Sequence, residues 1–243
     1  MEQLYSFSSG SANDNMHLWL RGAALFINQM NNLLEHTNYN FNITDIHYFQ
    51  NKNSTRLGNI LEQHKSDKST AHDYHLLYSF IFNKLDENIN ILEIGLGTNN
   101  PHLVSSMGPY GRPGASLYAF REYLPNANIY GGDIDRDILF ESERIKTSFV
   151  DQLEITTFDN LSNTFGNIKY DLIIDDGLHS IGANFNTLLF ALKNLNDNGW
   201  IVIEDIHIID NWKSIDFILR SSNKFKTYIV NAKHGYLYVI NKL

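Results

Sequence analysis

The spacing of apolar residues changes about a third of the way along the chain. Apolar positions recur three or four residues apart between residues 16 and 34, at Leu20, Ala23, Ala24, Ile27, Met30 and Leu34. This spacing predicts an amphipathic helix that packs on the protein or forms a dimer. A second helix is expected over residues 70–85, with Asp67 or Ser69 as its N-cap. The asparagine-rich residues 37–53 between them are expected to form a loop with at most one short turn.

After residue 88, short apolar runs alternate with helical segments. The expected strands are NILEIGLG, NIYGGDID, RIKTSFVD, YDLIIDDG and WIVIEDIH, and helical segments such as ASLYAFREYL and NFNTLLFALKNL lie between them. Such alternation implies right-handed crossovers and a parallel sheet covered on both faces. The last two apolar runs flank His234 and Gly235, which is a hairpin signal. The sequence therefore predicts a doubly wound α/β domain over residues 88–243, with a mostly parallel, seven-stranded sheet, an antiparallel C-terminal hairpin and a helical extension over residues 1–87.

Composition excludes several classes of function. With 243 residues, 43% hydrophobic and 13% aromatic, the chain can bury a sizeable core. The net charge of −8 argues against binding a nucleic-acid backbone as the main task. The absence of cysteine excludes disulfides, thiolate zinc sites and cysteine nucleophiles, and it fits a cytoplasmic protein. Arg21 interrupts the most apolar N-terminal stretch, so we expect neither a signal peptide nor a membrane-spanning segment.

The first strand after residue 88 runs into a glycine-rich turn. Gly95 and Gly97 allow a ligand to approach the backbone closely, although a G-x-G alone is common in α/β turns. Asn100 occupies the third glycine position of a dinucleotide loop, so that pattern is incomplete. Glu93 is an acid on a buried strand, which requires a hydrogen bond or a cation. S-adenosylmethionine carries a sulfonium and an ammonium, whereas NAD carries a pyrophosphate that an acid repels.

The next two strand ends also carry polar residues. Asp133 ends the second strand, where a carboxylate can accept both hydroxyls of a ribose. Asp151 and Gln152 end the third strand, where the adenine would lie. Ligands of open α/β sheets bind along this carboxyl edge, so these residues and Glu93 predict a nucleoside site. Capping of a helix is the alternative role for such acids, and Asp135 is the better candidate for it.

Two later strands each end in two acids followed by a histidine. The sets are Asp175, Asp176 and His179, and Glu204, Asp205 and His207. Magnesium prefers carboxylate oxygens, so acids from both strands could share one divalent ion at the sheet edge. Acids at strand ends also cap helices or solvate loops, but a cluster of them in a cleft favours a functional site. His207 is expected to be a loop histidine or an indirect partner of the site.

Together these motifs carry a family resemblance. The stretches LEIGLG, GGDID, FVDQ, IIDDGLH and IEDIH resemble class I S-adenosylmethionine-dependent methyltransferases. More narrowly, they resemble the magnesium-dependent O-methyltransferases that act on sugars of macrolides and related glycosylated products. SDKSTAHDYHLLY is similar to the T-D-K-G-x-x-H-x-Y stretch of that family, so the resemblance covers about residues 66–207. It implies a Rossmann-like methyltransferase fold, with S-adenosylmethionine and Mg²⁺ as cofactors.

The resemblance also implies roles for individual residues. His179 corresponds to the catalytic base, and Asp176, Glu204 and Asp205 correspond to the magnesium ligands. Cofactor contacts are implied at Ser66, Glu93, Gly95, Gly97, Ser116, Asp133, Asp151, Gln152 and Asp175. Residues 99–114 form a longer loop than the family pattern, and the first sixty residues match nothing in it, so both regions bear on the acceptor.

The leading hypothesis is an O-methyltransferase that acts on a small polar acceptor. A sugar, a sugar nucleotide or another glycosylated precursor is the first choice, by resemblance alone. A catechol-like acceptor and an inactive S-adenosylmethionine-binding module are the alternatives. The retained acids and His179 favour catalysis, because binding the cofactor alone needs neither a metal nor a base. We expect no nucleic-acid or membrane partner, and a homo-oligomer formed through the N-terminal helix is possible.

Overall fold

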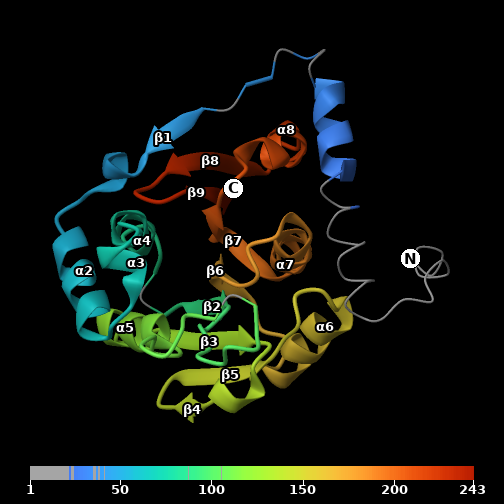
Figure 1. Cartoon of the computed structure of the whole chain (residues 1–243). Helices are drawn as coiled ribbons and strands as arrows, with labels where there is room; N and C mark the ends of the chain where they lie inside the picture. Colours follow the sequence, from blue (N-terminus) through green and yellow to red (C-terminus); the bar gives the residue numbers. More distant parts are fainter. Residues whose placement is uncertain are drawn as a thin grey trace, which may run out of the picture.

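The computed structural model describes residues 22, 25–34, 37, 39–40, 42–86, 88–104 and 106–243. One mixed sheet runs through this part of the chain, in the strand order β1-β8-β9-β7-β6-β2-β3-β5-β4, with helices on both of its faces (Figure 1). Its strands are β1 (Ile43–Asp45), β2 (Asn90–Ile94), β3 (Asn128–Asp133), β4 (Glu141–Ser142), β5 (Ile145–Phe149), β6 (Tyr170–Asp175), β7 (Leu195–Ile206), β8 (Phe225–Asn231) and β9 (Tyr236–Lys242). The central strands β7, β6, β2, β3 and β5 are parallel, and β9 pairs antiparallel with both β7 and β8.

The helices form two layers. One layer contains α2 (Ser54–Gln63), α3 (Asp67–Thr70), α4 (His75–Phe82) and α5 (Ala115–Tyr123), and the other contains α6 (Ile155–Thr164), α7 (Ile181–Asn194) and α8 (Lys213–Ser221). Short 3₁₀ turns lie at η2 (Ile46–Phe49), η3 (Arg136–Ile138) and η4 (Ile209–Trp212). Each layer packs its own hydrophobic cluster against the sheet. No helix in the described part of the chain is long and apolar enough to cross a membrane.

The alternation of side chains along the strands determines which polar residues share a face. Ile91, Leu172 and Val202 belong to the cluster on the α2–α5 face. Their neighbours Leu92, Ile173 and Ile201 belong to the cluster on the α6–α8 face. Because successive side chains of a strand point to opposite faces, Glu93, Asp176 and Glu204 belong to the α2–α5 face, and Asp175 belongs to the other.

The structure confirms the doubly wound sheet and the hairpin, but the predicted number of strands is wrong. Among the described residues the sheet has nine strands rather than seven, because β1 and β4 extend it at its two edges. The strand β1 lies in residues 37–53, which were expected to be loop, and it pairs in parallel with β8. It escapes sequence reasoning because it has only three residues and no fully buried position.

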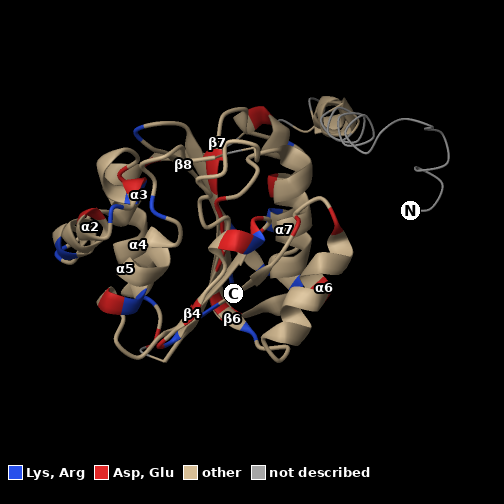
Figure 2. Ribbon diagram, turned by 60° about the horizontal axis from the view of Figure 1, so that its bottom comes forward, with Lys and Arg blue, Asp and Glu red and all other residues tan. Residues whose placement is uncertain are grey.

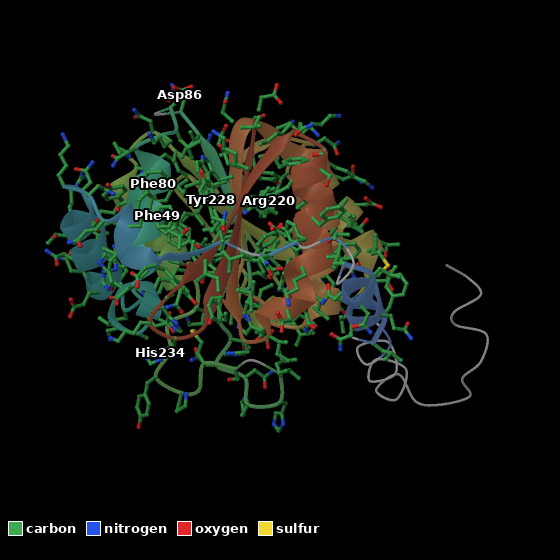
Figure 3. The ribbon with its side chains drawn as sticks, turned by 90° about the horizontal axis from the view of Figure 1, so that it is seen from above. Phe49, Phe80, Asp86, Arg220, Tyr228 and His234 are labelled. Atoms are coloured by element: carbon green, nitrogen blue, oxygen red, sulfur yellow. The ribbon has the colours of Figure 1, made fainter. Side chains whose placement is uncertain are left out.

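The N-terminal region also differs from the expected helical extension. Residues 25–34 of the expected first helix (residues 16–34) are helical, whereas its residues 16–21, 23 and 24 lie outside the described residues. The expected helix over residues 70–85 is found only as α4, and α3 precedes it. The predicted N-cap, Asp67 or Ser69, is wrong, because Ser66 caps α3. A left-handed residue, Asp73, lies between the two helices. Phe49 packs edge-to-face against Phe80 and Tyr228, with ring centroids 5.1 and 6.1 Å away (Figure 3). The segment before β2 therefore shares the core of the sheet.

Candidate active site

A cavity of about 330 Å³ opens at the carboxyl ends of β2, β3 and β5. Of the residues predicted from sequence, it is lined by Gly95, Gly97, Asp133, Asp151, Gln152 and Asp176. Apolar side chains complete the wall, including Ile94, Leu103, Val104, Ile134, Val150, Leu153 and Leu178. The cavity thus combines apolar walls with a few polar groups at the edge where ligands of α/β sheets bind.

Gly95 is required by the close approach of two strand ends. Its φ is +93°, and a Cβ built there would lie 2.0 Å from the carbonyl oxygen of Asp176. The backbone of Asp176 is fixed nearby, because its amide donates to the carbonyl of Ile94 at 2.8 Å. The glycine turn therefore brings the loop after β6 against the end of β2, and it places Asp176 at the wall of the cavity.

Asp133 supports the glycine turn as well as lining the cavity. One carboxylate oxygen accepts from the backbone amide of Leu96 at 2.7 Å, and the other accepts from the amide of Asp135 at 2.8 Å. Burial raises the pKa of Asp133, and the two amide donors oppose that effect. A carboxylate accepts about four hydrogen bonds, so Asp133 keeps acceptor capacity for a ligand.

Gln152 is held by Asp175, whose side chain lies on the α6–α8 face of the sheet. Its amide nitrogen donates to Asp175 and to Thr187, both at 2.8 Å, and its oxygen accepts from the amide of Leu178 at 2.7 Å. Asn184 also donates to Asp175, at 3.0 Å. Asp175 is fully buried and lies outside the cavity wall, so in this structure it positions Gln152 and α7.

Ser66, Glu93 and Ser116 also lie outside the cavity wall. Ser66 caps the N-terminus of α3, and its oxygen accepts from the amide of Lys68 at 3.4 Å. Ser116 donates to one oxygen of Glu93 at 2.6 Å. The protein itself supplies the cation that the buried Glu93 requires, because the ammonium of Lys68 lies 3.2 Å from its other oxygen.

Lys68 is the centre of a buried charge cluster that sequence reasoning missed. Its side chain lies 2.5 Å from Glu204 and 2.7 Å from Asp176, in addition to Glu93. Burial alone would lower the pKa of Lys68, but the three carboxylates raise it well above its ordinary value, so the ammonium stays charged. The stretch SDKSTAHDYHLLY contained the signal, but the three acids lie far from it in the sequence.

Asp176, His179 and Asp205 gather beside the cavity, and one potential ligand atom of each lies within 4.8 Å of the other two. The Nε2 atom of His179 lies 4.0 Å from Oδ1 of Asp176 and 3.7 Å from Oδ2 of Asp205. His179 and Asp205 both have left-handed backbone conformations, with φ of +53° and +54°. Such conformations are uncommon for residues other than glycine and concentrate at functional sites.

Asp205 reaches the cluster because the β7–β9 ladder is irregular at that point. The pairing register shifts between Ile203 and Ile206, which is the signature of a β-bulge, and such a bulge redirects a side chain. Tyr74 donates to Oδ1 of Asp205 at 2.6 Å. Burial and the nearby charges of Glu204 and Asp205 raise the pKa of Tyr74, so its hydroxyl remains a donor. The imidazole of His72 stacks on Tyr74, with its Nδ1 atom 3.6 Å from Asp205.

Glu204 is close to this cluster but faces a different partner. One of its oxygens lies against Lys68, and the other accepts from the hydroxyl of Tyr78. Both oxygens are therefore engaged within the protein. Acidic residues on β7 are red in Figure 2. His207 is exposed and lies outside the group of Asp176, His179 and Asp205.

The chain is similar in sequence to known O-methyltransferases. No family model matches the chain. Over 184 residues it is 30% identical to the 8-demethyl-8-alpha-L-rhamnosyl tetracenomycin-C 2'-O-methyltransferase of Streptomyces olivaceus, and the match covers 73% of this chain and 46% of that protein. Over 125 residues it is 31% identical to the Mycinamicin VI 2''-O-methyltransferase of Micromonospora griseorubida, covering 50% of this chain and 28% of that protein. The chain is therefore homologous in sequence to these named O-methyltransferases.

Solved structures give the same fold. The MycE methyltransferase of the mycinamycin biosynthetic pathway, in complex with Mg and SAH, superposes with a TM-score of 0.60 at 20% identity. That match covers 76% of this chain and 54% of the MycE chain. The mixed sheet with its antiparallel hairpin is thus the Rossmann-like methyltransferase fold predicted from sequence. The chain spans less than half the length of the curated relatives that it matches.

Proposed function

We propose that the chain is an S-adenosylmethionine- and Mg²⁺-dependent O-methyltransferase that acts on a hydroxyl of a small polar acceptor. The observation that carries this proposal is the double position of Asp176, which lines the cavity and also belongs to the cluster with His179 and Asp205. A cofactor in the cavity and an acceptor at the cluster would therefore meet at one residue. Proximity of two bound reactants is the main requirement of a direct group transfer.

The cavity has the donor set that a nucleoside cofactor needs. The lone pairs that remain on Asp133 can accept ribose hydroxyls, and Asp151 and Gln152 lie at the neighbouring strand end. Gly95 and Gly97 leave room for the ligand along the backbone. Glu93, Ser66, Ser116 and Asp175, which the family resemblance also marked, would support the cofactor from behind the cavity wall. Bound S-adenosylmethionine supplies a methyl group on a sulfonium.

The acidic cluster fits a divalent cation. Oδ1 of Asp176 and Oδ2 of Asp205 both lie near Nε2 of His179. Neither oxygen accepts a hydrogen bond from any residue that the structure describes. Two carboxylate oxygens, completed by water and substrate, are a usual protein share of Mg²⁺ coordination. We propose Asp176 and Asp205 as direct ligands. Glu204, the third predicted ligand, would have to bind the ion through an oxygen that already has Lys68 or Tyr78 as a partner. A bound dication lowers the pKa of a hydroxyl that contacts it.

His179 is the proposed catalytic base. Its Nε2 atom is directed toward both aspartates, and its side chain is partly exposed, so an acceptor hydroxyl can reach it. In the proposed reaction, His179 accepts the hydroxyl proton while the acceptor oxygen forms a bond to the methyl carbon. The bond from that carbon to sulfur breaks, which leaves a neutral thioether and a protonated imidazole. His179 then releases the proton to water.

A sugar hydroxyl is the proposed acceptor, because the named relatives methylate sugar hydroxyls of glycosylated products. Adjacent hydroxyls of a pyranose could both face the aspartates, as could the hydroxyls of a catechol. Leu103 and Val104, in the loop where the chain departs from the family pattern, line the cofactor cavity, and the acceptor itself would lie at Asp176, His179 and Asp205.

A methyl-transfer assay with labelled S-adenosylmethionine tests the proposal. Glycosylated polyketides, free deoxysugars, sugar nucleotides and catechols form the acceptor panel. We expect transfer to a sugar hydroxyl that stops with chelator and returns with Mg²⁺, while S-adenosylhomocysteine still binds in chelator. Full transfer in chelator would refute the metal site, and transfer only to catechols would replace the acceptor class. Binding of NAD without binding of S-adenosylhomocysteine would refute the whole proposal.

A further inference from the structure

The buried ammonium of Lys68 contacts an acid on the cofactor side of the proposed site, Glu93, and an acid on its metal side, Asp176. Lys68 is 2% exposed and enters from α3, on the face that also carries Glu93, Asp176 and Glu204. An ammonium has three N–H donors, and the three carboxylate oxygens lie 2.5, 2.7 and 3.2 Å from it. Its donors can therefore all be used within the protein, and none needs to reach a substrate.

Each of the two proposed metal ligands has one oxygen held and one oxygen free. Lys68 holds Oδ2 of Asp176 and leaves Oδ1 toward His179. Tyr74 holds Oδ1 of Asp205 and leaves Oδ2 toward His179. Groups that bind the far side of a ligand in this way fix its orientation and strengthen metal binding.

On the other side, Lys68 supports the strand that leads into the cofactor turn. Glu93 precedes Gly95 by two residues, and its carboxylate is fixed between Lys68 and Ser116. Asp176 packs its backbone directly on Gly95. A shift of the ammonium would thus disturb both the end of β2 and the orientation of Asp176.

We propose that Lys68 is a positioning residue that holds the metal ligand Asp176 and the cofactor-side acid Glu93 in one fixed arrangement. This inference rests on the proposed function. It assigns Tyr74 a narrower role, because that hydroxyl touches Asp205 but none of the groups on the cofactor side. It assigns Ser116 the opposite role, because that hydroxyl touches Glu93 alone.

Three variants separate these roles: Lys68→Met, Tyr74→Phe and Ser116→Ala. Calorimetric titrations with Mg²⁺, and separately with S-adenosylhomocysteine in chelator, measure the two affinities without turnover. We expect Tyr74→Phe to weaken Mg²⁺ binding by about 10-fold and to leave S-adenosylhomocysteine binding unchanged. We expect Ser116→Ala to leave Mg²⁺ binding unchanged and to weaken S-adenosylhomocysteine binding by less than about 10-fold. We expect Lys68→Met to weaken Mg²⁺ binding by about 10–100-fold and to weaken S-adenosylhomocysteine binding as well.

Lys68→Met leaves buried carboxylates without a cation, so it could fail to fold. Lys68→Arg then serves as the second variant, because it keeps the charge but not the compact geometry of the ammonium. The proposal expects Lys68→Arg to fold and to lose affinity for both ligands. Wild-type Mg²⁺ affinity in either folded Lys68 variant, or loss at one ligand only, would overturn it. If the wild-type chain binds neither ligand, the proposed function itself fails.

Discussion

At the scale of single residues, the alternation along the strands accounts for the acidic site. Glu93, Asp176 and Glu204 share a face because each follows the two-residue period of its strand. That much could be read from the sequence once the strands were recognised. The cation that makes the three acids compatible could not, because Lys68 is separated from Asp176 by 108 positions and from Glu204 by 136. Sequence reasoning assigned that neutralising charge to a ligand, whereas the protein supplies a large part of it.

His179 provides a prediction at this scale. If its imidazole is the base, His179→Ala should reduce kcat by roughly 10²–10⁴-fold. Mg²⁺ affinity should change little, because magnesium prefers oxygen to nitrogen ligands. Steady-state kinetics and a Mg²⁺ titration of the same preparation check both parts.

The matched control is His207→Ala, since His207 is exposed and lies outside the cluster. It should keep wild-type kcat and wild-type Mg²⁺ affinity. A folded His179→Ala enzyme with normal turnover would move the base elsewhere, with His207 tested next. A His179→Ala enzyme that no longer binds Mg²⁺ would make His179 a ligand.

At the scale of elements, the central strands, α5, α7 and the hairpin follow the sequence closely because their apolar patterns are long and regular. The predictions that failed concern single short segments. The strand β1 is too short to show a pattern, and the break between α3 and α4 depends on the left-handed Asp73 rather than on proline or glycine. The bulge that redirects Asp205 lies between Ile203 and Ile206, and no glycine or proline in that stretch marks it.

Asp133 joins the end of β3 to the glycine turn after β2, and its replacement gives a prediction. Asp133→Asn places an amide NH₂ against one of the backbone donors, Leu96 or Asp135, so it should destabilise the fold by about 1–3 kcal/mol. S-adenosylhomocysteine binding should weaken by about 1–3 kcal/mol, because a charged acceptor is lost. Urea denaturation and calorimetry measure the two effects, and a folded variant with unchanged affinity would show that Asp133 is only structural.

The pKa of Asp133 adds a dependence on pH. Burial raises this pKa in the folded chain above its unfolded value, so the folded state binds more protons in the interval between the two. The contribution of the group to stability is therefore greatest below the unfolded pKa and is lost as the pH rises through the folded pKa. Asp133→Asn lacks this titration, so its stability deficit relative to wild type should shrink from acidic to neutral pH. A deficit that grows over this range would contradict the raised pKa.

At the scale of the whole molecule, the N-terminal helix lies against the outer layer rather than in the core. Residues 25–34 lie beside α8 in Figure 1, and Asn31 accepts from the amide and the hydroxyl of Ser214, at 3.1 and 2.8 Å. Tyr39 donates to the buried carboxylate of Asp216 on α8. The segment before β1 is thus attached by polar contacts and by Ile27, which packs on the α6–α8 cluster, whereas Leu25, Phe26 and Leu33 are exposed.

Those apolar side chains predict an oligomer. Leu25, Phe26 and Leu33 are 60%, 59% and 64% exposed, which is unfavourable for a chain that stays single in water. A second copy of the chain, packed helix against helix, would bury them. We therefore expect wild-type protein to exceed the monomer mass in light scattering, and the triple variant Leu25→Ser, Phe26→Ser, Leu33→Ser to fall toward it. Binding of S-adenosylhomocysteine should be retained in the variant, because the cavity is lined by other elements. A wild-type chain of monomer mass would discard the dimer, and an altered acceptor KM in the triple variant would instead assign this helix to the acceptor side of the site.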